Sequence, residues 1–526
     1  MAALAPALAP PAAACSAQPF AALPICSNCA ASPELSRAWV ERHDGGGARL
    51  VVHSVSSDCR AKATGGDAWV VRFVTRTSTW RELARDLKNG TYVAHVPPDE
   101  LSVHDVTAHA ELWYTTRDPH YLETQWVVNA SRGTFGNSQL AFGSLSGESA
   151  MQCVAGNVPS VRIEAASSTK GRGPASRSSC PPGELSGAHQ RGRFVRTSEC
   201  ATLGLGDCGT GGGAAAKMAE AHSWVPTGCA MQPRCPPDVR RCLGGRRLLI
   251  IGDSISNGFA LDVCERLNGT CVGYQGPPAP LPDAEIIISN HIGYPPRVGL
   301  ANLVQDHTFP QWAAVLKGFN NGVVVLNSGA HDVAFDPFRW KATPLTAYRS
   351  NLRALAKLVE QAANTTTRFV WRQTTHQILI DTPPGTPQTA KLRGYHCAFR
   401  AYPGTHPLVI SAENDAARAI FGPLGVRVWE EPAALTLSAP FGCWKDAQHH
   451  DICGAGGDRY RGEWAANCAR ERRAGTHERN GLHHVHVSGN MTWHQMGGLS
   501  EAITDTFFTS VLGCSSCAPT PRTVRR

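Results

Sequence analysis

A Gly-Asp-Ser tripeptide ending at Ser254 directly follows an apolar run at residues 248–251. Helical periodicity begins soon afterwards and continues to residue 267. Ser254 is therefore expected in a tight strand-to-helix turn, at a helix N-terminus where backbone N–H groups face a developing anion. That position suits a nucleophilic serine. Asp and Ser are also ordinary N-cap residues, so a purely structural role for the tripeptide stays open.

A histidine-rich segment before the last helix contains candidates for the base that a serine nucleophile needs. Its histidines are His477, His483, His484 and His486. Asn480 lies three residues before His483, a spacing that places two side chains on one turn. Each histidine alone is consistent with a solvated loop residue, but we expect at least one of them to act in the site.

A polar loop follows the third apolar run, residues 323–326, and reads Asn327-Ser328-Gly329-Ala330-His331-Asp332. Amide and imidazole donors on a glycine-containing loop beside a nucleophile are what an oxyanion hole requires. The alternative is a polar turn in which Asn327 satisfies local backbone groups.

From residue 245 onward, apolar runs alternate with helical patterns, which predicts an α/β domain with a parallel sheet covered on both faces. In such a sheet the site lies at the carboxyl ends of the strands. We expect helices over 343–359, 411–421 with Gly422 as C-cap, and 499–513. The five expected strands are 248–251, 286–288, 323–326, 369–371 and 426–429.

The chain before residue 245 has a different organisation. Residues 1–30 are rich in Ala and Pro and are expected to be a disordered or targeting segment. Residues 31–150 carry short β-branched runs at the spacing of a seven-strand-type sandwich. Residues 151–244 form a Cys-rich connector, and residues 245–526 the α/β domain. The expected sandwich strands are 50–55, 69–74, 91–94, 110–114 and 125–128.

The composition indicates the cellular compartment and argues against one class of binding partner. With 526 residues, 42% hydrophobic and 17% charged, the chain can bury more than one core and is not mainly disordered. Its 19 cysteines favour an oxidising compartment, and the odd number requires at least one thiol that is free or bonded to another chain. The net charge is +8, but the chain has no run of five or more consecutive basic residues. This argues against nucleic acid as a binding partner.

Further sequence features concern the secretory pathway. No apolar run is long enough to span a bilayer, and the apolar N-terminus lacks the basic segment of a signal peptide. We nevertheless predict the Golgi lumen or the extracellular space from the cysteines. The C-x-x-C pairs at Cys26 and Cys514 favour disulfides over a zinc site. N-glycosylation sequons begin at Asn89, Asn129, Asn268, Asn364 and Asn490.

Three segments in order, GRFVRTSEC, SWVPTGC and CLGGRRLLIIGDSISNG, resemble the PC-esterase group of the SGNH/GDSL hydrolase superfamily. That group includes the trichome birefringence-like proteins and the neurexophilin-and-PC-esterase family. The resemblance covers about residues 185–515. The segments GGDAWVVRF and DLKNGTYVAHVPP, within residues 35–130, resemble filamin and immunoglobulin-like repeats.

The resemblance implies an SGNH-type three-layer αβα domain with a five-stranded parallel sheet, preceded by an immunoglobulin-like β-sandwich. It implies O-acetyl transfer or acetylester hydrolysis on a glycan through an acyl-serine, with no cofactor or metal. The acyl donor would be a compound such as acetyl-CoA or an acetylated glycan. The implied roles are nucleophile for Ser254, general base for His483, and oxyanion donors for Asn327, Gly329 and the Ser254 N–H, with Gly293 a weaker candidate.

The chain departs from the family pattern at two places. The acid that orients the histidine is replaced by Asn480, so Glu478 or Asp332 would have to supply a carboxylate, or the amide oxygen would accept the imidazole N–H. The usual Gly-x-Asn-Asp block reads Gly329-Ala330-His331-Asp332, so the amide donor role falls to His331 or Asn327.

Two alternative functions follow. The Asn480 substitution favours a catalytically impaired glycan-binding or adhesion protein of the same fold. A zinc hydrolase is the other alternative, although no specific metal-binding spacing is present. Its candidate ligands are His484, His486, His449, His450, Asp451 and His494.

Overall fold

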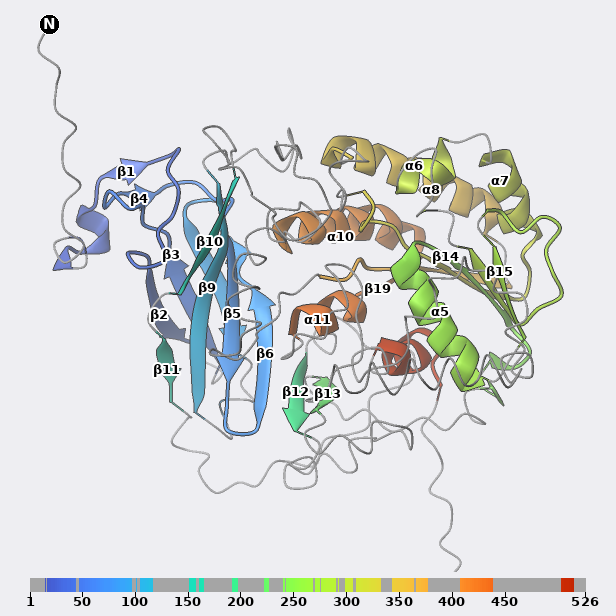
Figure 1. Cartoon of the computed structure of the whole chain (residues 1–526), viewed down its shortest axis with the longest axis horizontal. Coiled ribbons are helices and arrows are strands. Elements are labelled where there is room, and N and C mark those ends of the chain that lie inside the picture. The colour runs from blue at the N-terminus through green and yellow to red at the C-terminus, as the bar shows by residue number, and fades with distance from the viewer. Residues whose placement is uncertain are drawn as a thin grey trace, which may run out of the picture. The chain divides into compact units, whose positions relative to one another are not determined.

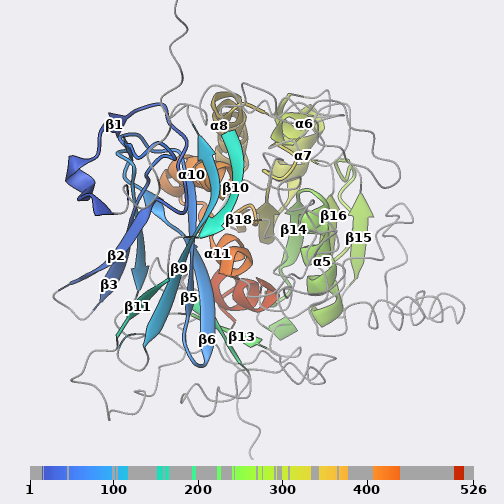
Figure 2. The ribbon, with the colours of Figure 1, turned by 60° about the vertical axis from the view of Figure 1, so that its left-hand side comes forward.

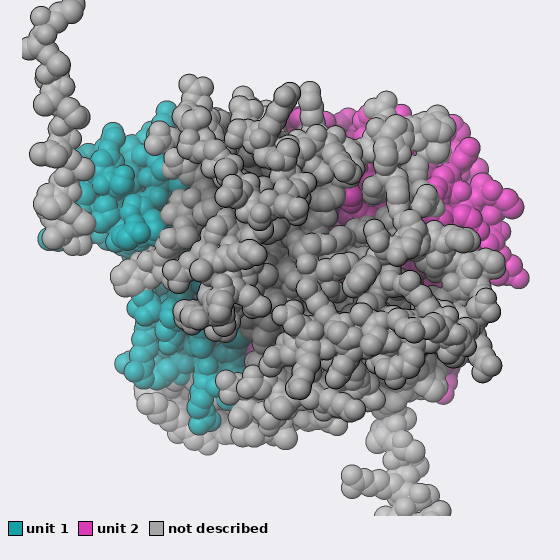
Figure 3. Space-filling view, viewed as in Figure 1, with its two compact units in different colours: residues 1–173, 387–402, 406–408 teal, residues 174–386, 403–405, 409–526 magenta. Residues whose placement is uncertain are grey.

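The computed structural model divides the chain into two compact units (Figure 3). The first contains residues 1–173, 387–402 and 406–408, and the second contains residues 174–386, 403–405 and 409–526. The structure describes residues 15, 17–43, 47–96, 101, 105–116, 151–157, 160–164, 192–196, 222–226, 240–241, 243–267, 270–274, 276–289, 292, 299–305, 309–332, 343–363, 366–376, 407–438 and 503–514.

Two antiparallel sheets in the first unit share one hydrophobic core (Figures 1 and 2). Side chains alternate along each strand, so Trp69, Val71 and Phe73 enter this core from a single strand. One sheet has the order β2 (Arg37–Arg42), β3 (Ala48–His53), β8 (Thr91–Val96), β7 (Arg85–Asp86). In the other, β9 (Val106–Thr116) pairs with β5 (Ala68–Val74), β10 (Met151–Asn157) and β11 (Val161–Ile163), and β5 pairs with β6 (Ser78–Leu83).

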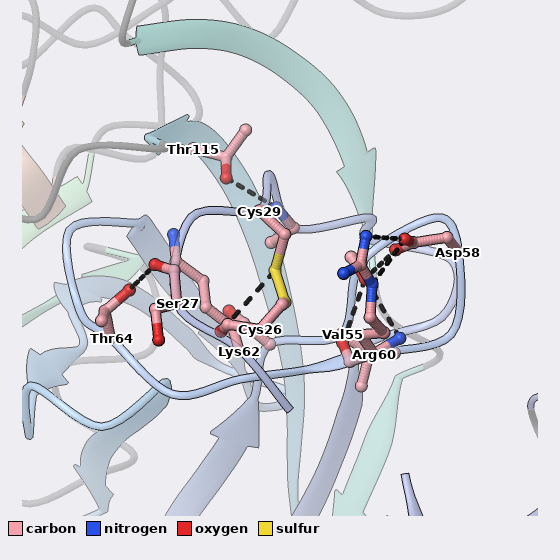
Figure 4. The surroundings of a disulfide bond; sticks show 12 residues. Cys26, Ser27, Cys29, Val55, Asp58, Arg60, Lys62, Thr64 and Thr115 are labelled. Atoms are coloured by element: carbon pink, nitrogen blue, oxygen red, sulfur yellow. Dashed lines mark hydrogen bonds and ion pairs between the residues drawn. A yellow bond between two sulfur atoms is a disulfide. The ribbon is translucent and has the colours of Figure 1, made fainter. Parts of the chain in front are cut away.

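A short segment with disulfides lies next to these sheets. Here β1 (Ile25–Cys26) pairs in parallel with β4 (Ala61–Lys62), after the turn η1 (Phe20–Ala22). A disulfide joins Cys26 to Cys29 (Figure 4), and another joins Cys15 to Cys59. The first C-x-x-C pair is therefore a disulfide, as predicted, and Cys514 of the second pair is also disulfide-bonded.

An ion pair is buried at the edge of the first unit's core. Nζ of Lys62 lies 2.5 Å from Oδ1 of Asp67, and both side chains are fully buried. The carboxylate also accepts hydrogen bonds from the hydroxyls of Ser54 and Thr115, each at 2.7 Å. Burial of these charges is tolerated because the oxygens of Asp67 have several donors.

The second unit contains a six-stranded sheet whose neighbouring strands all pair in parallel. The prediction of an α/β domain with a parallel sheet is confirmed, but the predicted number of five strands is wrong. The additional strand is β15, whose sequence CVGY contains a glycine and only one fully buried residue, so it shows no continuous apolar run. The order is β15 (Cys271–Tyr274), β16 (Ile286–Ser289), β14 (Arg247–Ile251), β17 (Gly322–Leu326), β18 (Thr367–Arg372), β19 (Arg427–Trp429).

The strand order of this sheet indicates where a ligand-binding site is expected. From β14 the chain builds β15 and β16 on one side of it, and then returns to place β17 on the other side. The crevice at such a reversal, outside the carboxyl ends of the strands, is where ligands bind in open α/β sheets. Here the reversal lies between the ends of β14 and β17.

Helices lie on both sides of this sheet, with α5 on one side and α6, α7 and α8 on the other (Figures 1 and 2). Rings of Phe259 in α5 and Phe507 in η9 lie 5.0 Å apart and both pack on Trp429 of β19. The helices are α5 (Ser254–Leu267), α6 (Leu300–Val304), α7 (Phe309–Gly318), α8 (Leu345–Ala362), α10 (Pro407–Phe421), η8 (Gly422–Leu424), α11 (Glu431–Ser438) and the π-type turn η9 (Phe507–Val511).

Helix ends differ from the predictions in small ways. Pro344 is the N-cap of α8, directly before its first turn. Gly422 does not end α10 as a left-handed C-cap, because the chain continues into η8 and Gly425 takes that conformation with φ 70°. The last helix does end as predicted, since Gly513 has φ 72°. Within the described ranges, no helix is long and apolar enough to cross a bilayer.

Two segments that carry the family resemblance pair with each other. Strand β12 (Gly192–Arg196) runs antiparallel to β13 (His222–Pro226), and the rings of Phe194 and Trp224 meet edge to face at 5.0 Å. A side chain at Gly192 would collide with Trp224, so this close approach needs glycine. The sequence segments GRFVR and HSWVP are thus one β-ribbon.

Candidate functional site

The turn after β14 holds Ser254 at the first residue of α5. Asp253 is the cap of this helix, since its Oδ1 accepts hydrogen bonds from the N–H groups of Ile255 at 3.0 Å and Ser256 at 3.2 Å. The predicted strand-to-helix turn is therefore present, and Asp253 has the structural capping role that the sequence left open. Gly252 is required there, because a Cβ would lie 2.2 Å from the hydroxyl of Ser256.

Asn327, directly after β17, connects three neighbouring strands at their carboxyl ends. Its Oδ1 accepts a hydrogen bond from the Ser256 hydroxyl at 3.0 Å, and its Nδ2 donates to the carbonyl of Arg372 at 2.9 Å. Both partners are distant in sequence, so the alternative of a locally satisfied turn residue is wrong. Asn327 is therefore held by both ends of its amide, and its role as an oxyanion donor stays a prediction.

Gly329 lies in the same loop with φ 151°, a backbone conformation that favours glycine. A Cβ at this position would lie 2.1 Å from Oγ1 of Thr374 and 2.8 Å from Oε2 of Glu413. The preceding carbonyl, that of Ser328, accepts hydrogen bonds from the hydroxyls of Tyr348 at 3.1 Å and Thr374 at 2.8 Å. The loop is thus held from α8 and from the segment after β18.

Asp332 ends this loop and is fully buried. Its carboxyl accepts hydrogen bonds from the Leu300 N–H, at 3.0 Å and 3.2 Å to the two oxygens, and from the Ser328 hydroxyl. Burial raises the pKa of Asp332 to about 7, against the lowering effect of these hydrogen bonds. The carboxyl that the sequence offered as a substitute acid therefore anchors the start of α6. His331, before it, is buried as well.

The five polar residues after the apolar part of β18 are all buried, and the sequence patterns above did not predict them. They follow a buried strand as Ser254 and Asn327 do, and this signal would have found them. The guanidinium of Arg372 lies 5.8 Å from the Phe259 ring and 6.0 Å from the Trp429 ring. Burial lowers its pKa to about 10, opposed by the charge of Asp253. The five are Arg372, Gln373, Thr374, Thr375 and His376.

Helices α10 and α11 hold this segment in place. Asn414 of α10 binds the backbone of Thr374 twice, accepting from its N–H at 2.8 Å and donating to its carbonyl at 3.0 Å. Thr436 of α11 accepts from the N–H of His376 at 2.9 Å. Burial lowers the pKa of His376 to about 4, so this imidazole is neutral at neutral pH. Glu413, beside Asn414, is also fully buried and was not predicted.

The structure therefore brings together the Ser254 turn, the loop from Asn327 to Asp332, and the segment after β18. The predicted general base and its orienting residues, His483, Asn480 and Glu478, lie outside the described residues, as does Gly293. The histidines of the zinc alternative lie outside them too. These assignments stay predictions.

Comparison with known proteins adds no assignment. No family model matches the chain, and no solved structure matches it. A proposal for the function therefore depends on the residues arranged around the Ser254 turn.

Proposed function

We propose that the protein is a serine-dependent O-acyltransferase or carboxylic ester hydrolase that acts on glycans. One observation carries the proposal. Ser254 begins α5 at the reversal of the parallel sheet, and the Ser256–Asn327 hydrogen bond ties this turn to the candidate oxyanion loop. A serine at the first residue of a helix lies where backbone N–H groups face a developing anion, which is one of the requirements of acyl transfer.

The proposed chemistry has two steps. In the first, Oγ of Ser254 attacks the acyl carbonyl, its proton passes to the base, and the alcohol of the ester or the thiol of a donor such as acetyl-CoA leaves with a proton. In the second, water or a sugar hydroxyl attacks the acyl-serine and regenerates Ser254. Water yields the free acid, and a sugar hydroxyl yields an acetylated sugar.

The family and the substrate class come from the resemblance of the motifs. We assign the second unit to the SGNH type and the PC-esterase group, and the two-sheet part of the first unit to the immunoglobulin-like class. Pairing of β12 with β13 supports this assignment, since it joins two of the three family segments in one ribbon. A glycan substrate in the Golgi lumen or outside the cell fits the disulfides of the chain.

A second function keeps its support from two observations. Asn480 stands where the family has an acid. The carboxyl of Asp332, one of two possible replacements, is held by Leu300 and Ser328. A protein of this fold that binds glycans without acyl transfer is therefore the competing proposal.

The test is acyl-enzyme formation with para-nitrophenyl acetate, followed by intact-protein mass spectrometry. We expect one acetyl group on the wild-type protein and none on Ser254→Ala. Ser350→Ala, an exposed serine of α8, is the matched control and should retain acetylation. Equal acetylation of wild type and Ser254→Ala contradicts the serine mechanism. Asn480→Asp should raise the turnover rate if residue 480 orients the base.

A further inference from the structure

Glu413 of α10 lies buried against the candidate oxyanion loop. Its side chain is fully buried, and neither carboxyl oxygen has a partner among the described residues. The position that a Cβ of Gly329 would take lies only 2.8 Å from Oε2 of Glu413. Glycine at 329 thus lets this carboxyl approach the backbone of the loop directly.

Among the described residues, the charge that acts on Glu413 is that of another carboxyl group, Asp332. Asp332, from the loop after β17, carries the same sign and raises the pKa of Glu413 further above the ordinary value that burial has already raised. From α8, the phenol of Tyr348 has a pKa that is raised by burial first and then by the charges of Glu413 and Asp332. The segment after β18 contributes Thr374, whose hydroxyl donates its hydrogen bond to the carbonyl of Ser328.

A carboxylate buried without donors is very unfavourable, so burial favours the neutral form of Glu413. The neutral form matters for the site beside it. An oxyanion stabilised by the Gly329 loop would be opposed by a second negative charge on the buried Glu413, next to the same backbone.

We propose that Glu413 is a positioning residue that must stay protonated for acyl transfer at the Gly329 loop. The neutral side chain packs against the backbone of Gly329. When Glu413 ionises, its negative charge opposes the oxyanion and acyl transfer is lost. This inference rests on the proposed function, and it adds a pH gate that is separate from the titration of the catalytic base.

The first test is the pH profile of kcat/KM for para-nitrophenyl acetate. Glutamine keeps the shape of the neutral acid but cannot ionise. We expect Glu413→Ala to lose about tenfold or more in kcat/KM and Glu413→Gln to recover most of that loss. Wild type should lose activity about tenfold per pH unit on the alkaline side, and Glu413→Gln should lack this fall. Glu360→Gln, an exposed residue of α8, should show the wild-type profile.

A second test needs no activity. Infrared difference spectroscopy of wild type minus Glu413→Gln at neutral pH should show the stretch of a protonated carboxyl group, and the band should be missing from wild type minus Glu360→Gln. A carboxylate band in its place overturns the inference even if the enzyme is active. If Ser254→Ala is acetylated like wild type while the protonated band is present, the proposed function fails and the neutral state of Glu413 stands. An unchanged alkaline limb in Glu413→Gln, with acetylation dependent on Ser254, overturns the gate alone.

Discussion

The hydroxyl of Ser256 donates a hydrogen bond to Oδ1 of Asn327 across 71 positions of sequence, at 3.0 Å. Ser256 lies two residues after the candidate nucleophile, and Asn327 begins the loop that is expected to stabilise an oxyanion. The same amide donates to the carbonyl of Arg372, at the end of β18. The side chain of Asn327 thus links the turn that contains Ser254 to the loop that is proposed to stabilise the oxyanion.

We predict that Ser256 and Asn327 are energetically coupled. Asn327→Ala leaves the carbonyl of Arg372 without its donor, so we expect a loss of about 1–3 kcal/mol in the free energy of unfolding. Ser256→Ala should cost about 1 kcal/mol. A double-mutant cycle by urea unfolding should give an interaction energy of about 0.5–3 kcal/mol. Strictly additive losses would show that the bond contributes nothing to the fold.

A second prediction concerns Gly329. In Gly329→Ala, the new methyl group would lie 2.1 Å from Oγ1 of Thr374 in a backbone conformation with φ 151°. We expect a loss of about 2 kcal/mol or more in the free energy of unfolding, together with loss of acyl transfer. Gly276→Ala is the matched control, since its Cβ would meet no atom within 4 Å and its φ is ordinary. Equal stability of the two variants would contradict the close packing of the loop.

The sequence predicted those elements of the second unit that show a continuous buried run or a full helical stripe. Strands β14, β16 and β17 are continuous apolar runs, and the apolar residues of helix α8 repeat at the helical period. Strand β15 is short and only partly buried, so its residues look like a loop. Its place is fixed by pairing with β16, which no local pattern reveals.

The same limit applies to the site. The rule that polar residues after a buried strand form the site predicted Ser254 and Asn327, and it would also have found Arg372 to His376. Glu413 could not be found in this way, because it lies inside a helix and meets Gly329 only through packing of α10. Asp332 was predicted as a possible substitute acid because it is a carboxyl group in the neighbouring loop. Its real partner, the Leu300 N–H, depends on where α6 begins.

The buried ion pair of the first unit gives a third prediction. Lys62→Met leaves the carboxylate of Asp67 buried without its cation, so we expect a loss of about 3–5 kcal/mol in the free energy of unfolding. Lys62→Met combined with Asp67→Asn should recover part of this loss. Arg60→Met breaks the ion pair of Arg60 with Asp58. These two side chains are 48% and 40% exposed, so the free energy of unfolding should stay nearly unchanged. Similar losses for Lys62→Met and Arg60→Met would contradict the role of burial.

The last prediction is the pH dependence that Asp332 gives to stability. Its pKa rises from 3.8 to about 7 on folding, mainly by burial, so the folded state binds the proton more tightly than the unfolded state. The stabilisation is complete below about pH 4 and is lost as the pH rises to about 7. Three pH units correspond to about 4 kcal/mol.

Asp332→Asn removes the titrating group, so urea unfolding of the two proteins isolates its contribution. The difference in free energy of unfolding, wild type minus variant, should be largest near pH 4 and should shrink by about 4 kcal/mol as the pH approaches 7. Burial and the charge of Asp332 also raise the pKa of Glu413, so both proteins should carry Glu413→Gln, which leaves Asp332 as the group whose titration differs between them. A difference that is constant between pH 4 and 7 would mean that Asp332 is ionised throughout, and that its hydrogen bonds with Leu300 and Ser328 outweigh its burial.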